Sequence, residues 1–392
     1  GGITHLIELL RATSPPENEI EEVTVWSGQA TLKQVPHRPW LQLVHEEMLD
    51  HSFLWRQMWQ VARLPALAAV ACDVLFTPGA TPQRVAIPHV TMCQNMLPFE
   101  PAERWRYGWS SMGVKLRMLE HAQSRSFRQA DGVIFLTQYA SQTVQQRIGL
   151  LRSPQTIVPH GIADEFRLAP RPVYPIKSYS PTHPFRLVYV SIVSVYKHQW
   201  HVANAVAQLR QAGFPVVIDF VGPAYGPALH RLQGVLQRVD PAQEFIRYVG
   251  PVSYRDLPIW YHKADAFVYA SSCENLPIIL LEAMAAGLPI ACSNRGPMPE
   301  VLGQAGLYFD PENVAEIKSA LRVLLIDHEL RQQFAQSAFE QSLTYTWARC
   351  AKETFEFIGQ VAKHSATAKL SKVGGDPRKM PDAADSCEEQ GG

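Results

Sequence analysis

Two glutamates eight positions apart mark the segment of the chain that is best suited to chemistry. Glu274 precedes an expected short helix, and Glu282 lies within that helix. Pro277 suits the first turn of the helix, and Gly287 suits the position just beyond its end. The free N–H groups at the start of a helix attract anions, but a carboxylate at the same place repels a phosphate. We therefore expect the two glutamates to hydrogen-bond a neutral polyol such as a sugar or a ribose.

The residues that open this helix are expected to contribute to the same site. The free N–H groups would come from Ile278 and Ile279, at the edge of a sheet where the preceding strand 266–269 ends. Asn275 and Leu276 belong to the loop between that strand and the helix. A plainer interpretation is a carboxylate that stabilises the helix dipole, followed by an exposed helical glutamate.

A second polar loop follows the expected strand 187–190. It carries Ser191, Ile192 and Lys197. Ligands of open parallel sheets bind beyond the carboxyl ends of the strands, so a lysine in this loop can reach a bound phosphate. A lysine in isolation is more often a solvated surface residue, and the interpretation therefore depends on its place in the loop.

Together these segments resemble the retaining glycosyltransferases of family 4. The resemblance rests on the spacing of Glu274 and Glu282, the Ala-Met-Ala-Ala-Gly run that follows, and Lys197. It implies a GT-B fold, in which two Rossmann-like domains with parallel sheets face a central cleft. It also implies that Glu274 contacts donor-sugar hydroxyls, Glu282 contacts the ribose and Lys197 binds the donor diphosphate. Ser191 and Ile192 replace the family's Gly-Arg pair, so one expected phosphate cation is missing.

Other residues are expected at the site because of their positions in the family pattern. Gly1 and Gly2 open a helix, as a phosphate-binding glycine pair does, and we expect the strand before them to be missing. Gln94 and Asn95 stand where the family often has His-Asp. Neither amide can act as a base, but both can hydrogen-bond a sugar or acceptor. His160, in a Pro-His-Gly-Ile loop, is a further expected contact.

The cation missing at position 192 has two candidate replacements. Arg295 lies three residues beyond the expected strand 289–292, at the sheet edge that faces the cleft, and Gly296 would let its loop bend toward the ligand. The alternative interpretation of Arg295 is a solvated loop arginine. His198 competes with it but is largely neutral at pH 7.

The elements that must position these residues follow an α/β pattern. Apolar runs of strand length alternate with segments of helical period, as in parallel sheets covered by helices. The strands are expected at 23–26, 74–76, 90–93, 133–136, 156–158, 187–190, 216–220, 266–269, 289–292 and 307–309.

Five prolines indicate a linker over 167–185. It would separate an N-terminal Rossmann-like, acceptor-side domain over 1–166 from a C-terminal nucleotide-sugar-binding domain over 186–345. The resemblance also implies that a final helix over 346–362 crosses back to the N-terminal domain. The segment 363–392 lacks aromatic residues and is expected to be disordered.

The composition narrows the class of protein. Lys+Arg and Asp+Glu both number 36, and this balance argues against a nucleic-acid partner. The six scattered cysteines form no zinc-ligand pattern and fit a reduced cytoplasmic compartment. No apolar run is long enough to span a bilayer. The basic, aromatic segment 103–128 is interpreted either as a peripheral contact with the inner face of the membrane or as a helix with a solvated basic face.

The resemblance thus implies a hexosyltransferase, of mannosyl type, that uses a nucleotide-diphosphate sugar and retains the anomeric configuration. The acceptor is expected to be a glycan or a lipid-linked molecule in surface polysaccharide synthesis. No metal or other cofactor is expected, and the departing diphosphate would help to deprotonate the acceptor. Two alternatives stay open: another GT-B enzyme, such as a sugar-nucleotide epimerase, and a degenerate transferase that serves as an interaction module.

Overall fold

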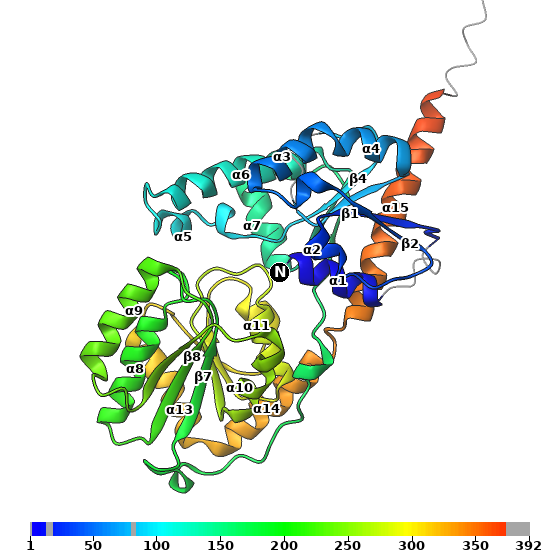
Figure 1. The fold of residues 1–392 in the computed structure, drawn as a ribbon. Helices are drawn as coiled ribbons and strands as arrows, with labels where there is room; N and C mark the ends of the chain where they lie inside the picture. The colour runs from blue at the N-terminus through cyan, green and yellow to red at the C-terminus, as the bar shows by residue number, and fades with distance from the viewer. Residues whose placement is uncertain (1, 13–18, 80–83, 374–392) are drawn as a thin grey trace, which may run out of the picture.

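The computed structural model describes residues 2–12, 19–79 and 84–373, which form two α/β domains, one above the other in Figure 1. The upper domain contains the N-terminal part of the chain, and the lower domain begins with β7. Gly1, one of the two predicted phosphate-binding glycines, lies outside the described residues, as does the segment 374–392.

In the described part of the N-terminal domain, the strands form two parallel sheets. The larger has the order β3-β4-β5-β6, and β1 pairs with β2 in a separate two-stranded sheet. The strands are β1 (Val23–Ser27), β2 (Leu41–His45), β3 (Leu75–Thr77), β4 (His89–Met92), β5 (Gly132–Phe135) and β6 (Gln155–Ile157). The helices are α1 (Gly2–Ala12), α2 (Gln29–Leu32), α3 (Phe53–Ala62), α4 (Leu64–Ala71), α5 (Pro101–Trp105), α6 (Ser111–Gln129) and α7 (Gln138–Ile148).

The C-terminal domain is built on one parallel sheet of order β12-β11-β10-β7-β8-β9. Its strands are β7 (Phe185–Val190), β8 (Val216–Val221), β9 (Ile246–Gly250), β10 (Ala266–Tyr269), β11 (Ile290–Ser293) and β12 (Leu307–Phe309). The helices are α8 (Gln199–Gln211), α9 (Gly226–Val239), α10 (Leu257–Lys263), α11 (Ile278–Ala285), α12 (Met298–Leu302), α13 (Val314–Ile326) and α14 (His328–Ser342). Helices α8, α9 and α13 cover one face of the sheet, and α10, α11 and α14 cover the other (Figure 1).

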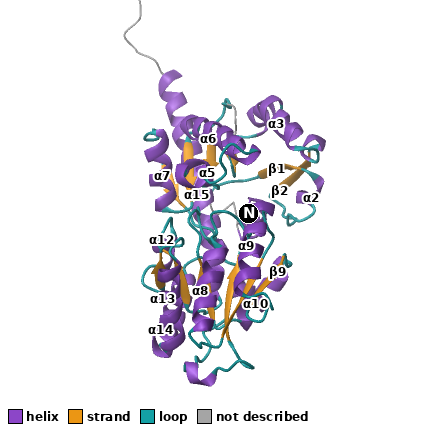
Figure 2. Ribbon diagram, turned by 90° about the vertical axis from the view of Figure 1, so that its left-hand side faces the viewer, coloured by secondary structure: helices purple, strands orange, loops and turns teal. Residues whose placement is uncertain are grey.

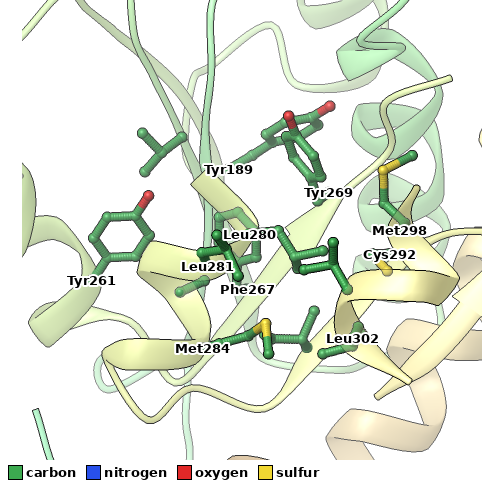
Figure 3. Packing of buried hydrophobic residues seen from close by; sticks show 14 of the residues in the cluster. Tyr189, Tyr261, Phe267, Tyr269, Leu280, Leu281, Met284, Cys292, Met298 and Leu302 are labelled. Carbon is green, nitrogen blue, oxygen red and sulfur yellow. The ribbon is translucent and has the colours of Figure 1, made fainter. Parts of the chain in front are cut away.

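The core of this domain fixes the segment that carries the two glutamates. Figure 3 shows Leu280, Leu281 and Met284 of α11 packed over Phe267 and Tyr269 of β10. All five side chains are fully buried. Burying large apolar side chains contributes roughly 1.5–3 kcal/mol each, so α11 is held firmly against the sheet.

The expected strands are present with bounds that differ by two residues or fewer, and two further strands, β2 and β9, were missed. Both missed strands are short and mix buried with exposed positions. The strand β9 also lies at the edge of its sheet. An edge strand needs no continuous apolar run, so the pattern used to find buried parallel strands does not detect it.

The last helix, α15 (Trp347–Val373), crosses from the lower domain to the upper one and packs against α1, β4 and β5 (Figure 1, Figure 2). An added Cβ at Gly161 would lie 2.1 Å from the backbone nitrogen of Trp347, so only glycine allows this close passage. The predicted disorder from residue 363 onward is wrong for 363–373, which continue the helix. That stretch contains alanine, lysine and leucine, which favour helix over coil.

Candidate active site

Lys197 and Glu274 form an ion pair at the carboxyl-end edge of the C-terminal sheet, where they follow β7 and β10. The Lys197 ammonium also donates to the Tyr269 hydroxyl at 2.8 Å, and that hydroxyl donates to Glu274 Oε1 at 2.7 Å. Ser271 Oγ donates to the same carboxylate oxygen. We call these four residues the Lys197–Glu274 cluster. The structure therefore brings together the two residues predicted to carry the chemistry.

The cluster fixes one oxygen of Glu274 and leaves the other available. Lys197, Tyr269 and Ser271 all donate to Oε1, and no donor among the described residues bonds Oε2. Burial raises the pKa of Tyr269 well above its usual value, so its hydroxyl stays protonated and remains a donor. A carboxylate with one oxygen anchored and the other available is suited to accept hydrogen bonds from ligand hydroxyls.

Glu282 lies deeper than Glu274, inside the first turns of α11, and is only 3% exposed. It accepts a hydrogen bond from the Tyr261 hydroxyl at 2.9 Å. Burial raises the pKa of Glu282 to about 7, against the opposing effect of its tyrosine partners. Its charge therefore changes near neutral pH, which the sequence did not predict.

The start of α11 differs from the expectation in one respect. The N–H group of Ile278 donates to the Leu276 carbonyl at 2.9 Å and is not free. The chain makes a tight turn at Pro277, which brings these two residues within hydrogen-bond distance. Ile279 is half-buried at the second position of the helix, and Leu276 is buried in the core.

Asn275 joins this loop to the N-terminal domain. Its Nδ2 donates to the Cys93 carbonyl at 2.8 Å, and its own carbonyl accepts from Thr137 Oγ1 at 3.0 Å. Its Oδ1 is buried and has no partner among the described residues. Since Cys93 precedes Gln94 and Asn275 follows Glu274, the predicted sugar-contacting segments of the two domains are adjacent.

Gly2, the first described residue, lies next to the predicted sugar-contacting segment that begins at Gln94. An added Cβ at Gly2 would lie 3.0 Å from Gln94 Oε1, so α1 begins beside that amide. The side chain of Asn95 makes a local hydrogen bond, in which its Oδ1 accepts from the Leu97 N–H at 3.1 Å. Of the two predicted amides, Gln94 is thus the one that makes no strong local hydrogen bond.

His160 lies in an aromatic cluster. Its ring centroid is 4.3 Å from that of His5 in α1 and 5.6 Å from that of Trp347 in α15. Burial lowers the pKa of His160 well below its usual value, so the ring is neutral. Neither ring nitrogen has a hydrogen-bond partner among the described residues. The structure gives it packing contacts with α1 and α15 and no hydrogen bond to the Lys197–Glu274 cluster.

The loop after β7 is tightly packed. Ser191 is buried, and its hydroxyl donates to the Ile192 carbonyl at 3.1 Å. His198 contacts the Ser272 hydroxyl through Nε2 at 2.9 Å, and burial lowers the pKa of His198 to about 3. A neutral imidazole cannot supply the charge missing at Ile192, so the structure argues against His198 as the replacement cation.

Arg295, the predicted replacement cation, is paired with carboxylates in the unliganded protein. Its guanidinium bonds both carboxylate oxygens of Asp310, at 2.8 and 3.0 Å, and Glu312 Oε1 at 2.7 Å. Arg106 of the N-terminal domain binds Glu312 as well, together with Glu103. The two carboxylates follow β12, a strand that lies next to β11, which precedes Arg295. Sequence spacing does not reveal that these neighbours share one edge.

Several residues at the site were not predicted. Tyr269 was predicted only as part of the strand 266–269, and Tyr261 was not singled out, although their hydroxyls bond the two glutamates. The position of Tyr269 at the end of a buried strand could have indicated its role, because a buried tyrosine hydroxyl usually has a hydrogen-bond partner. Arg106 and Thr137 could not be found from sequence, since their roles depend on how the two domains meet.

The segment 103–128 forms the end of α5 and most of α6, and its arginines have two different roles. Arg104 is buried and pairs with Glu120, so it does not belong to a solvated basic face. Arg117 lies over the exposed ring of Trp109, 4.3 Å from the centroid. In the described residues, no helix is long and apolar enough to cross a bilayer, and no three His, Cys, Asp or Glu side chains gather as metal ligands.

Parts of the chain are similar to known proteins. Residues 171–341 match the family model of glycosyl transferases group 1. Over 110 residues the chain is 38% identical to the O-antigen chain mannosyltransferase B of Escherichia coli, covering 28% of this chain and 29% of that protein. Over 252 residues it is 29% identical to a glycogen synthase of Mycobacterium tuberculosis, covering 63% and 58%. The matched regions thus span less than two thirds of either relative.

The fold was compared with solved structures. The crystal structure of the Anabaena protein HepE in complex with UDP and glucose superposes with a TM-score of 0.62, covering 95% of this chain and 96% of that one. The sequence identity is 16%, so this likeness concerns the fold alone.

Proposed function

We propose that the protein transfers a hexosyl group from a nucleotide-diphosphate sugar, because residues 171–341 match the family model of glycosyl transferases group 1 and the described chain has the GT-B fold. The observation that carries the proposal is the Lys197–Glu274 cluster. It presents one open carboxylate oxygen beside a buried ammonium, at the edge of the sheet where such folds bind ligands. The carboxylate oxygen can accept hydrogen bonds from the hydroxyls of a hexose, and the ammonium can bind the phosphate attached to that hexose.

In the proposed reaction, Glu274 Oε2 accepts hydrogen bonds from hydroxyls of the donor sugar, and Lys197 stabilises the charge of the departing diphosphate. The transfer proceeds with retention, because the leaving phosphate takes the proton of the acceptor hydroxyl on the same face of the sugar. Catalysis then comes mainly from placement and electrostatic stabilisation, with no metal or other cofactor. The proposed role of Glu282 is to hold the ribose in its ionised form.

The donor sugar is proposed to be mannose and the acceptor a glycan or a lipid-linked molecule of surface polysaccharide synthesis. The mannosyltransferase relative from Escherichia coli supports the sugar and the pathway class. Bound UDP in the related Anabaena structure supports a nucleotide donor in general.

A peripheral contact with the cytoplasmic membrane face is proposed for α5 and α6. Trp105, Trp109 and Met118 are 59%, 80% and 69% exposed, and Arg117 lies over both tryptophan rings. Aromatic and cationic side chains together on one exposed helical surface favour the interface of an anionic bilayer. Such a contact would bring a lipid-linked acceptor to the N-terminal domain.

The test uses purified protein with GDP-mannose, UDP-glucose and UDP-N-acetylglucosamine and a mixture of oligosaccharide acceptors. We expect one donor to release its nucleoside diphosphate and to yield a product with the donor's anomeric configuration, seen by NMR. An inverted linkage would overturn the retaining mechanism. Stabilisation by a nucleoside diphosphate without turnover of any donor would favour the non-catalytic alternative, whereas epimerised free sugar nucleotide would favour the epimerase.

A further inference from the structure

A separate hollow lies between α8 and α9 of the C-terminal domain. Its volume is about 500 Å³, and none of the four residues of the Lys197–Glu274 cluster lines it. Sites for small molecules typically measure about 300–1,000 Å³. The hollow is therefore large enough for a monosaccharide, and it is distinct from the candidate active site.

A glycine in the middle of α9 forms part of the wall of the hollow. Gly234 is exposed, and nothing lies within 4 Å of the position that its Cβ would take. Its backbone has ordinary helical geometry, so no left-handed conformation explains the residue. Glycine weakens the interior of a helix relative to alanine. Its effect here is to leave open space between two turns of the helix.

The wall of the hollow is cationic. Arg231 and Arg238 are exposed on the same face of α9, on either side of Gly234. Neither arginine forms an ion pair among the described residues, and no Asp or Glu lines the hollow. Arg231 is held over the ring of Trp200 in α8, with its guanidinium carbon 4.1 Å from the centroid. A fixed guanidinium with no carboxylate partner is suited to bind an anion.

A further donor comes from α8, and the same helix holds Arg231 in place. Trp200 is 2% exposed, and its indole Nε1 has no acceptor among the described residues. That N–H is buried from solvent, so Trp200 serves the hollow through its ring, which holds Arg231 in place. His201 is bonded through Nδ1 to the Pro311 carbonyl at 3.0 Å, which leaves Nε2 for another partner.

We propose that this hollow binds an anionic monosaccharide, a hexose phosphate or a hexuronate, as a second carbohydrate site. Arg231 and Arg238 bind the anionic group, and His201 Nε2 bonds a sugar oxygen. The proposal does not depend on the transfer reaction or on the identity of its donor.

Isothermal titration calorimetry of the full chain with glucose 6-phosphate, glucuronate, glucose and inorganic phosphate tests the proposal. We expect the two acidic sugars to bind at least about tenfold more tightly than glucose and than phosphate. The paired change Arg231→Gln with Arg238→Gln, and separately Gly234→Leu, should each weaken that binding by about tenfold or more. Arg322→Gln, an exposed arginine of α13 outside the hollow, is the control and should bind as the parent does.

Gly234→Leu fills the hollow without removing any charge, and the helix gains a better helix former, so folding should be preserved. Unchanged affinity in this variant with a preserved melting temperature would overturn the proposal. Loss of binding in Lys197→Met but not in the α9 variants would assign the ligand to the candidate active site and would also overturn it. Phosphate binding as tight as that of the acidic sugars would overturn the saccharide assignment.

Discussion

At the scale of single residues, the charges of Lys197 and Glu274 have two roles: each neutralises the other, and both are proposed to bind the donor. Lys197 is 3% exposed, and Glu274 is its carboxylate partner, so each compensates the other in the unliganded protein. In the proposed reaction, both also bind the donor. The pair can serve both states because the anchored oxygen of Glu274 keeps Lys197 compensated while the other oxygen bonds the sugar.

Glu274→Gln is expected to slow transfer by about ten- to hundredfold, since charge-assisted hydrogen bonds contribute roughly 1.5–3 kcal/mol. The same change should lower stability, because it leaves the Lys197 ammonium buried without its counter-ion; breaking a buried pair costs about 3–5 kcal/mol. Initial rates with the active donor and urea denaturation measure the two effects. Glu329→Gln, at an exposed position of α14, is the control. Transfer at the parental rate would remove Glu274 from the site.

Glu282 is expected to make stability depend on pH between about 4.5 and 7. Its pKa is about 7 in the folded protein and 4.5 in an unconstrained carboxyl group. In that window the folded state holds the proton and the unfolded state loses it, so stability falls as pH rises and the loss is complete above pH 7. The total is about 3 kcal/mol at 1.36 kcal/mol per pKa unit.

Glu282→Gln removes this titration. Melting temperatures of parent and variant at pH 5, 6, 7 and 8 should therefore diverge as pH rises, with the variant gaining relative to the parent. Parallel curves would show that the folded-state pKa of Glu282 is not raised. Binding of a nucleoside through the ionised carboxylate should strengthen over the same range.

At the scale of elements, sequence reasoning succeeded where burial alone dictates the pattern. The strand β10 (Ala266–Tyr269) was predicted with its observed bounds, because both of its faces are buried and its residues are continuously apolar. The convergence of Lys197 and Glu274 followed from the rule that parallel strands end at one edge. The hydrogen bond of Asn275 to Cys93 could not be predicted, since it depends on how two separately folded domains meet.

The surface of α5 and α6 is expected to bind anionic vesicles. Arg117→Gln should weaken binding about fivefold at low salt, because one cation near an anionic surface contributes about 1 kcal/mol. Trp109→Ala should weaken it further and independently of salt, since it removes apolar contact area. Sedimentation with phosphatidylglycerol vesicles measures both effects. Leu150→Ala, at an apolar position 87% exposed elsewhere on the domain, should bind as the parent does. Equal losses in all three variants would contradict a localised surface.

At the scale of the whole molecule, polar contacts between the domains surround the candidate site. The N-terminus of α7 receives a carboxylate from the other domain: the N–H groups of Gln138 and Tyr139 donate to Glu300 at 2.7 and 2.8 Å. Tyr107 contacts the Ser194 hydroxyl, in the loop that carries Lys197, at 3.3 Å. The relative placement of the domains is therefore tied to the same loops that would hold the donor.

The ion pair of Arg106 with Glu312 is expected to contribute a measurable part of this linkage. The N–H groups of Arg106 bond both oxygens of Glu312, at 3.0 and 2.6 Å, and these bonds lower the pKa of Glu312 to about 2. Both side chains are partly exposed, so a double-mutant cycle of Arg106→Gln and Glu312→Gln should give a coupling free energy of about 0.2–1 kcal/mol. Because the folded-state pKa is depressed, the coupling is present above about pH 4.5 and disappears as pH falls toward 2.

Urea denaturation of the four proteins at pH 7 and at pH 3 measures this coupling. A parallel cycle of Arg106→Gln with Glu316→Gln is the control. Glu316 lies four residues beyond Glu312 and makes no contact with Arg106 among the described residues, so its cycle should be additive. A coupling that is equal in the two cycles, or that is no smaller at pH 3 than at pH 7, would mean that the contact does not hold the domains together. Since salt screens partly exposed pairs, 1 M sodium chloride should reduce the coupling at pH 7 without changing the control.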